Sequence, residues 1–138
     1  EIIFVDKVLA PSTIRMDSMV GLTRTAHVTS TGKALLAFAS QEFINQYIKN
    51  IAFVRRTPHT IYSKEALLKE LETIRQEGYA CDDEESEVGL TCFAVPILSM
   101  KQAIAAISVS GPTFRMLEKK DFLVKTLQSI VKNIEASI

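Results

Sequence analysis

The feature that most restricts the fold of this chain is a pair of apolar, β-rich segments with only a few residues between them. The first segment runs from about Val88 to Leu98, and the second covers residues 103–111 and reads AIAAISVSG. Residues 100–102 leave room only for a tight turn, which joins antiparallel strands, because parallel strands need a crossover of a dozen or more residues. We therefore predict an antiparallel hairpin at the middle of a sheet.

A helix signal precedes this hairpin. Ser63 is a preferred N-cap residue, and Gly78 is a preferred residue just after a helix end. Between them, apolar side chains recur at three- and four-residue spacing and fall on one stripe. They are Leu67, Leu68, Leu71 and Ile74. The pattern predicts a helix over residues 64–77.

Three further helices are predicted from shorter signals. An apolar run at 32–39 and a segment at roughly 41–50, for which Ser40 is a suitable N-cap, would cover one face of the sheet. The last helix is predicted over residues 118–137. Its inward side is expected to hold Phe122, Leu127, Ile130, Val131 and Ile134.

The beginning of the chain is also β-rich. Residues 2–9 read IIFVDKVL, and after a turn at 10–13 the chain is predicted to return as a second strand at 14–16. Strands joined mainly by hairpins, with helices packed against them, predict an α+β fold with an antiparallel β-sheet flanked by α-helices. We expect a single domain over residues 1–138. Because the chain starts without Met inside a strand-like run, we expect it to be cut from a longer protein.

Composition argues against several classes of function. Sixteen Lys and Arg residues balance sixteen Asp and Glu residues, so the chain lacks the broad positive field that binds nucleic acid. No apolar run approaches the roughly 20 residues that span a bilayer, and no signal peptide is visible. The two cysteines fit a reducing compartment, so we expect a cytoplasmic protein without membrane contact. His27 and His59 lack neighbours at metal-ligand spacing, and we expect no metal and no cofactor.

The segment STGKALLAFAS at 30–40 contains a Gly-Lys pair like that of a nucleotide-binding phosphate loop. His27 stands where that motif needs a glycine, and Ala34 stands where it needs Ser or Thr. The pair therefore does not predict nucleotide binding. It marks a turn of small residues that leads into a helix, whose first backbone N–H groups are free to bind a carboxylate. We expect Lys33 itself to be a solvated surface lysine, with direct contact to the ligand as the alternative.

Five short stretches of the chain carry a family resemblance. They are TGKALLA (31–37), RTPHTI (56–61), Gly78-Tyr79 followed by DDEESEVGLTC (82–92), AVPI (94–97) and ISVSGP (107–112). In this order they resemble the C-terminal effector-binding domain of IclR-family bacterial transcription regulators, from about Phe4 to the end. The resemblance implies a GAF-like (profilin-like) fold and assembly into homodimers or homotetramers. It also implies an N-terminal winged helix-turn-helix domain, absent from this chain, through which alone the protein would bind DNA.

The residues expected to bind a ligand are Ser30, Thr31, Gly32, Asp82, Cys92, Ser108, Ser110, Met19 and Leu22. The first three enter a helix with free N–H groups. The resemblance implies that the next four line a pocket, and that the last two lie in a loop that closes it with apolar surface. Ser108 and Ser110 are two apart on one strand, so their hydroxyls point to the same face and can donate to a carboxylate. Without the resemblance, serines on a strand are more typical of packing, and Cys92 fits a buried apolar position equally well.

The function implied is that of a small-molecule-sensing regulatory domain. A carboxylate-type metabolite would favour one arrangement of the subunits and so change the spacing of the DNA-binding domains. Two alternatives stay open, a pure oligomerisation module with a collapsed pocket and a GAF-like thiol enzyme that uses Cys92. No histidine neighbours Cys92 in the sequence, so we expect no catalytic residues. The effector stays open among keto acids, glyoxylate-like small acids, sugar acids and aromatic acids.

Overall fold

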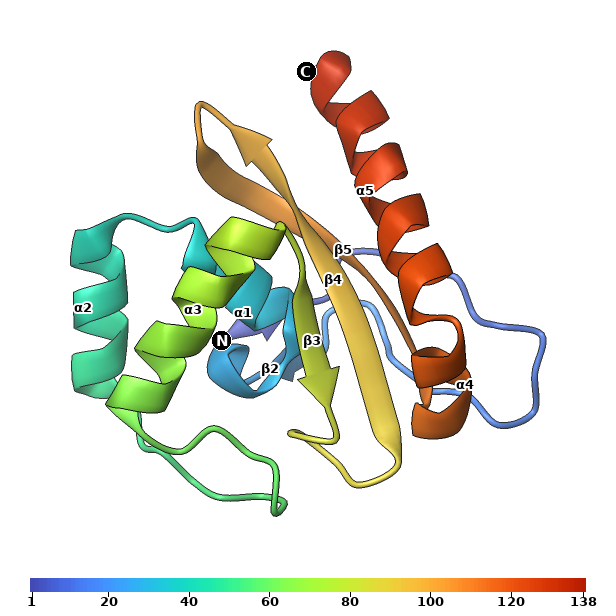
Figure 1. Cartoon of the computed structure of the whole chain (residues 1–138), viewed down its shortest axis with the longest axis horizontal. Coiled ribbons are helices and arrows are strands. Elements are labelled where there is room, and N and C mark those ends of the chain that lie inside the picture. The colour runs from blue at the N-terminus through green and yellow to red at the C-terminus, as the bar shows by residue number, and fades with distance from the viewer.

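The centre of the molecule, a computed structural model that describes all 138 residues, is a three-stranded antiparallel sheet (Figure 1). Its strands lie in the order β3, β4, β5 and comprise Ala80–Asp83, Leu90–Ser99 and Gln102–Pro112. Ser99 pairs with Gln102, so only two residues form the turn, and both have positive φ angles that match the twist of a tight hairpin. The predicted hairpin is confirmed, but β4 alone is the middle strand, because β5 lies at the edge of the sheet.

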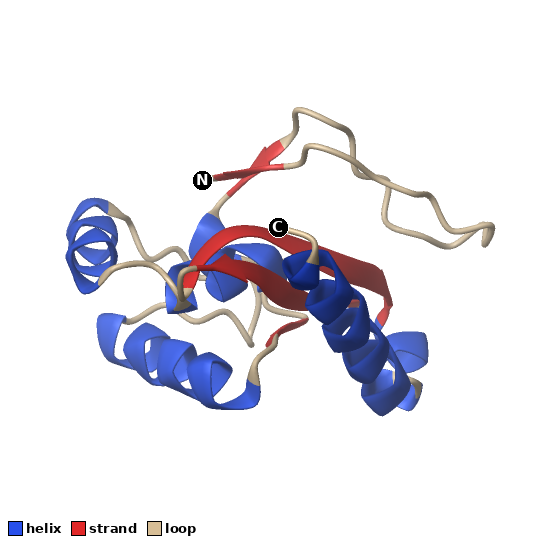
Figure 2. Ribbon diagram, turned by 90° about the horizontal axis from the view of Figure 1, so that it is seen from above, coloured by secondary structure: helices blue, strands red, loops and turns tan.

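Helices cover both faces of this sheet (Figures 1 and 2). They are α1 (Ser30–Ala37), α2 (Gln41–Asn50), α3 (Lys64–Glu77), α4 (Thr113–Glu118) and α5 (Lys120–Ala136), with a short 3-10 helix η1 at Ala26–Val28. One core lies between the sheet and α1, α2 and α3, and includes Ala94 of β4. A second core lies between the sheet and α5, and includes Phe93 and Val95. Side chains alternate along a strand, so β4 contributes to both cores.

The predicted helix caps are present. The Ser63 hydroxyl accepts a hydrogen bond from the backbone of Ala66, and Gly78 ends α3 with a left-handed φ of 77°. The Ser40 hydroxyl caps α2 in the same way. The α1 helix begins two residues earlier than predicted, because the Thr29 side chain caps it by accepting from the backbone N–H of Gly32. None of the helices has both the length and the apolar character that a bilayer crossing requires.

The predicted N-terminal hairpin closes at a different place. Strand β1 is only Ile2–Ile3, and it pairs with β2 at Thr23–Arg24, not with residues 14–16. Figure 2 shows the intervening segment as a long loop that reaches away from the two short strands. Phe4 packs partly buried against the first core, but most apolar side chains of the segment are exposed, and Val8 is 97% exposed. A β-rich composition alone does not make a strand where no second layer covers it.

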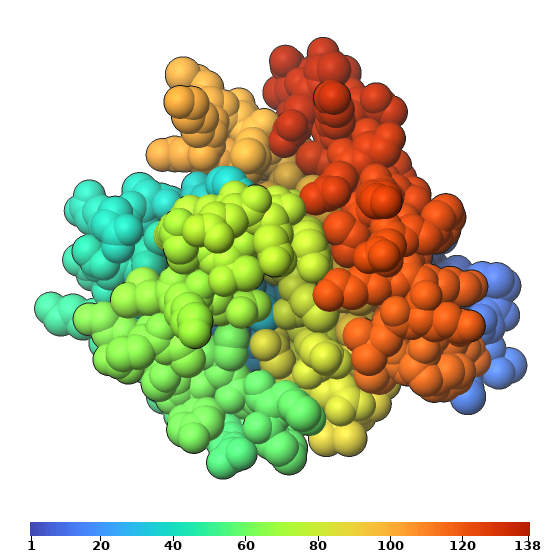
Figure 3. Space-filling view, in the orientation of Figure 1, coloured from blue at the N-terminus to red at the C-terminus, as the bar shows by residue number.

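The helix predicted over 118–137 is confirmed as α5 at Lys120–Ala136, and the sequence did not predict the short helix α4 at Thr113–Glu118 that precedes it. Lys119 has φ −104° and ψ 13°, and this irregular residue separates α4 from α5. Val124, Leu127 and Val131 are buried against the sheet, whereas Phe122 and Ile130, both predicted to face inward, are exposed. The buried positions follow the phase of α5 alone. In the space-filling view, the C-terminal end of α5 stands beside the projecting tip of the β4–β5 hairpin (Figure 3).

Candidate functional site

A pocket of about 590 Å³ lies where β3, β4 and β5 meet the start of α1. The N-terminal segment and the turn between β3 and β4 complete its walls. Six of the nine predicted ligand-binding residues line it. They are Ser30, Thr31, Asp82, Cys92, Ser108 and Ser110. These residues are far apart in the sequence, so the fold brings together one set of polar groups from a helix and three strands.

The register of the sheet sets three of these side chains in one row. Asp82 of β3 is paired with Cys92 of β4, and Cys92 is paired with Ser110 of β5. Ser108 lies two residues from Ser110 and therefore on the same face. The alternate residues of β4 and β5, such as Phe93, pack against α5 on the other face. One face of the sheet is thus the floor of the pocket.

The other three predicted residues do not line this pocket. A Cβ atom on Gly32 would lie 2.0 Å from the carbonyl oxygen of Ala26, so glycine is needed there for the close approach of α1 to η1. Met19 is exposed and Leu22 is partly buried next to β2. The N-terminal segment reaches the pocket through other residues instead. They are Phe4, Ile14, Arg15, Met16, Asp17 and Arg24.

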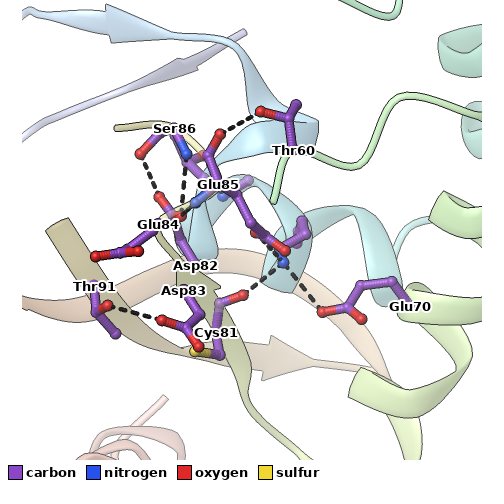
Figure 4. Close-up of polar contacts among 12 residues, drawn as sticks. Thr60, Glu70, Cys81, Asp82, Asp83, Glu84, Glu85, Ser86 and Thr91 are labelled. Carbon is purple, nitrogen blue, oxygen red and sulfur yellow. Dashed lines mark hydrogen bonds and ion pairs between the residues drawn. The ribbon is translucent and has the colours of Figure 1, made fainter. Parts of the chain in front are cut away.

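Asp82 is bound to its own turn (Figure 4). Its Oδ1 accepts hydrogen bonds from the backbone N–H groups of Glu85 at 2.8 Å and Ser86 at 3.2 Å, and its Oδ2 accepts from the Ser86 hydroxyl at 2.5 Å. Burial raises the pKa of Asp82, and these three hydrogen bonds oppose that rise. The carboxylate therefore shapes the turn between β3 and β4, which forms one wall of the pocket.

Lys33 is fully buried, in contrast to the solvated position expected for it. Its ammonium donates to Glu85 Oε2 at 2.6 Å, to the Cys81 carbonyl at 2.6 Å and to Glu70 Oε1 at 3.1 Å. Burial acts to lower the pKa of Lys33, but the two carboxylates outweigh it and the pKa is raised. All three ammonium donors have acceptors, so Lys33 joins α1 to the β3–β4 turn and to α3.

Two threonines of the RTPHTI stretch brace the same turn from outside. The Thr57 hydroxyl donates to the carbonyl of Glu84 at 2.6 Å, and the Thr60 hydroxyl donates to the carbonyl of Glu85 at 2.7 Å. Glu84 has a positive φ of 56°, a conformation that non-glycine residues rarely adopt without support. Arg56 is the one residue of the stretch that lines the pocket. Thr57 and Thr60 contribute by holding the turn in place.

Burial raises the pKa of the Cys92 thiol to about 12, and the charge of Asp82 adds to this effect. The thiol is therefore protonated at neutral pH and lacks the thiolate that nucleophilic catalysis requires. His27 is also buried, and its Nδ1 lies 2.9 Å from the Tyr47 hydroxyl oxygen. No group of three or more His, Cys, Asp or Glu side chains gathers in a way that could hold a metal ion.

Sequence reasoning missed three arginines that line the pocket, Arg15, Arg24 and Arg56. Arg56 donates from Nη2 to the Thr25 hydroxyl at 3.0 Å. Arg56 belongs to the RTPHTI stretch, which was the one available signal. Nothing in the sequence around Arg15 or Arg24 indicates that they approach the strand residues.

Residues 1–136 match the family described as Bacterial transcriptional regulator IclR C-terminal. The chain belongs to the IclR family. This IclR-family chain is 38% identical over 135 residues to the HTH-type transcriptional regulator KdgR of Dickeya chrysanthemi, a match that covers 96% of the chain and 44% of that protein. The chain thus spans about half the length of the curated relatives it matches.

Solved structures of the IclR family agree with this assignment. The C-terminal domain of KdgR from E. coli superposes with a TM-score of 0.79 at 37% identity, over 88% of this chain and 75% of that one. The inducer-binding domain of PobR from Acinetobacter, a double mutant in complex with 3-hydroxybenzoic acid, gives a TM-score of 0.79 at 30% identity, over 87% of this chain and 70% of that one. The predicted GAF-like α+β fold of the IclR-family domain is confirmed.

Proposed function

We propose that this chain is the ligand-sensing domain of a bacterial transcription regulator, and that it binds a small carboxylate-type metabolite in the pocket described above. The observation that carries the proposal is the row formed by Asp82, Cys92 and Ser110, which opens on the same pocket as the start of α1. The acid bound in the PobR structure supports a carboxylate ligand.

The start of α1 is the positive end of the helix dipole and would bind the carboxylate of the acid. Thr29 caps the helix through the N–H of Gly32, and no hydrogen bond within the chain takes up the N–H groups of Ser30 and Thr31. Such free N–H groups and the helix dipole favour a carboxylate. The hydroxyls of Ser108 and Ser110 then donate to a second oxygen of the ligand.

Binding would act on DNA through the rest of a longer protein. The curated relatives are HTH-type regulators about twice as long as this chain. A ligand shifts an equilibrium only by its different affinity for two arrangements, so it must favour one geometry of a homodimer or homotetramer. The spacing of paired DNA-binding domains then follows that geometry, because dimeric readers need a fixed half-site spacing.

The same domain is not an enzyme in this proposal. The relatives matched by the chain are transcriptional regulators. Cys92, the only thiol in the pocket, has a pKa of about 12, which leaves almost no thiolate at neutral pH. Alkylation of Cys92 should therefore be slow, and fast alkylation at neutral pH would favour the thiol-enzyme alternative.

The test is a thermal-shift screen of the chain against keto, sugar and aromatic acids, with the uncharged amide of each acid as its control. A ligand that binds only the folded state raises the Tm by mass action. We expect a shift that needs the carboxylate and is lost when Ser108→Ala and Ser110→Ala are combined. Ser129→Ala, on the exposed side of α5, is the matched control and should keep the shift. No shift with any acid at millimolar concentration would favour the oligomerisation module.

A further inference from the structure

The pocket is unusually polar for a ligand site. Only six of its 21 lining residues are hydrophobic, whereas small-molecule pockets are mostly lined by apolar and aromatic side chains with a few polar groups. An acid with an apolar or aromatic remainder would leave most of these polar groups without a partner, at a cost for each one that becomes buried. The polar lining therefore restricts the chemistry of the part of the ligand beyond its first carboxylate.

Two arginines of the lining have unused hydrogen-bonding capacity. No carboxylate lies within 4.0 Å of Arg24 or Arg56, although both border the pocket. A guanidinium has five N–H donors in a planar fork and accepts nothing. Within the chain, Arg24 donates to the carbonyl of Thr23 and Arg56 donates to the Thr25 hydroxyl. Most of their donors remain free for a ligand.

The acidic residues of the lining do not neutralise these arginines. The oxygens of Asp82 accept three hydrogen bonds from Glu85 and Ser86. Asp17 lies 3.8 Å from the ammonium of Lys7, and Glu87 makes no ion pair. The guanidinium groups of Arg24 and Arg56 therefore have no ion-pair partner within the chain and can pair with electron-rich ligand oxygens.

Arg56 is also anchored at both ends. Its backbone N–H donates to the Thr60 hydroxyl at 3.1 Å, and its guanidinium donates to the Thr25 hydroxyl at 3.0 Å. Thr60 in turn donates to the carbonyl of Glu85, so the backbone of Arg56 is attached to the wall of the pocket. Thr25 follows Arg24 directly in the chain, and both arginines line the pocket. A side chain held in this way loses less entropy when it binds a ligand.

We propose that Arg24 and Arg56 are specificity-determining residues that bind a second, oxygen-bearing group of the effector. The effector is then an acid that is polar along its length, with either a second carboxylate or several hydroxyls, and not an aliphatic or aromatic monoacid. This inference rests on the proposed function, because it assumes that a first carboxylate binds at α1 and the strand serines.

The test compares three acids with six carbons that differ only beyond the first carboxylate. Hexanoate has an apolar chain, gluconate has hydroxyls and adipate has a second carboxylate. Isothermal titration calorimetry on the 138-residue chain should give adipate or gluconate an affinity at least about tenfold above that of hexanoate, because charge-assisted hydrogen bonds are lost with the apolar tail. Whichever of the two binds more tightly identifies the second group.

Substitutions assign this preference to the arginines. Arg56→Met and Arg24→Met should each reduce the affinity for the favoured acid by about tenfold or more and leave hexanoate unchanged. Arg55→Met is the matched control, since Arg55 is the neighbour of Arg56 in the sequence but does not line the pocket and lies against the Tyr62 ring. The Tm of each variant, measured alongside, shows that the fold is retained.

Each other result overturns a defined part of the proposal. Equal binding of all three acids would show that no second group is recognised, while the proposed sensing function would stand. If the Arg56 and Arg24 variants weakened hexanoate as much as the favoured acid, the arginines would bind the first carboxylate, and the assignment would be wrong. If Arg55→Met weakened binding of the favoured acid to the same extent, the effect would come from the loss of a positive charge and not from contact of Arg24 and Arg56 with the ligand. Binding of none of the three acids would overturn the inference, and the wider acid screen described above would then decide whether the proposed function also fails.

Discussion

The two walls of the pocket are held by very different means. The turn between β3 and β4 is fixed by the buried ammonium of Lys33, by the Asp82 carboxylate and by the hydroxyls of two threonines. The N-terminal segment at 5–20 has mostly local contacts, such as those of Arg15 with the carbonyls of Ala10 and Ser12. One longer-range bond joins Arg115 to the carbonyl of Ile14.

This difference teaches how one pocket can be both selective and able to open. A wall whose polar groups are all satisfied keeps its geometry when the ligand leaves, so it can select by hydrogen bonding. A wall with exposed apolar side chains and few long-range bonds opens at low free-energy cost. Val5, Val8 and Met19 are exposed in this structure and are available to cover a bound ligand or a second subunit.

The largest effect is expected from Lys33→Met, which removes the cation from the fixed wall. Glu85 and Glu70 lose their partner, and the Cys81 carbonyl loses a donor. Breaking a buried ion pair costs about 3–5 kcal/mol. Urea unfolding should show this loss in the free energy of unfolding. Lys69→Met, on the exposed side of α3, should change it by less than about 0.5 kcal/mol. Similar losses for both variants would mean that the buried cation does not hold the wall.

A pH dependence of comparable size is expected from Glu85. Burial raises the pKa of Glu85 to about 7, against the opposing effect of Lys33, whereas the ordinary value is 4.5. The folded state therefore binds the proton more tightly than the unfolded state. This stabilisation is fully present below pH 4.5 and is lost as the pH rises through 7, by roughly 3 kcal/mol for a shift of this size.

Unfolding of the wild type and of Glu85→Gln at several pH values measures this contribution. As the pH rises from 4.5 to 7, the free energy of unfolding of the wild type should decrease relative to that of Glu85→Gln. A difference that does not change over this range would show that Glu85 titrates at its ordinary pKa. The ammonium of Lys33 would then offset the whole effect of burial on the pKa of Glu85.

A smaller effect is expected from Asp82→Ala, which releases the turn but leaves the Lys33 contacts in place. The backbone N–H groups of Glu85 and Ser86 lose their acceptor, at a cost of about 1–3 kcal/mol. The affinity for acids should fall as well, because Ser86 and Asp82 belong to the pocket lining. Glu118→Ala, exposed at the end of α4, is the control. Unchanged binding of acids by the Asp82 variant would mean that ligand recognition does not depend on the turn that Asp82 holds.

The smallest effect is expected in the open wall. Val8→Ser changes a side chain that is 97% exposed, so the free energy of unfolding should change by less than about 0.5 kcal/mol. Its effect on ligand affinity should also be small unless the segment closes over the ligand. A loss of several kcal/mol would mean that the 5–20 segment packs against the body in solution, and the contrast between the two walls would disappear.

Local signals were enough to predict much of the fold. Helix α3 has its N-cap, apolar stripe and terminal glycine within sixteen residues, and all three were read correctly. The β4–β5 hairpin is equally local. The second strand expected at 14–16 failed because pairing depends on a covering layer that the sequence does not specify. The inward positions of Phe122 and Ile130 failed because only the side of α5 that carries Val124, Leu127 and Val131 contacts the sheet, and the apolar residues beside that stripe stay exposed.

The site was less accessible to sequence reasoning. The strand serines were found from their spacing and the family resemblance, but the burial of Lys33 depends on Glu70 and Glu85, which are 37 and 52 residues away. Neither partner follows from the local pattern, in which a lysine near a helix start looks solvated. For the same reason the sequence does not distinguish Glu85, which is buried, from Glu87 two residues later, which is exposed.

The division of labour between the two faces of β4 and β5 has a consequence for how such regulators diversify. Cys92, Ser108 and Ser110 face the pocket, while Phe93 and Val109 between them anchor α5. Substitutions on the first set can retune chemical preference without disturbing the hydrophobic layer beneath α5, so a lineage can acquire new signals while retaining one scaffold. A biosensor library built on this chain would randomise the first set and leave the second untouched.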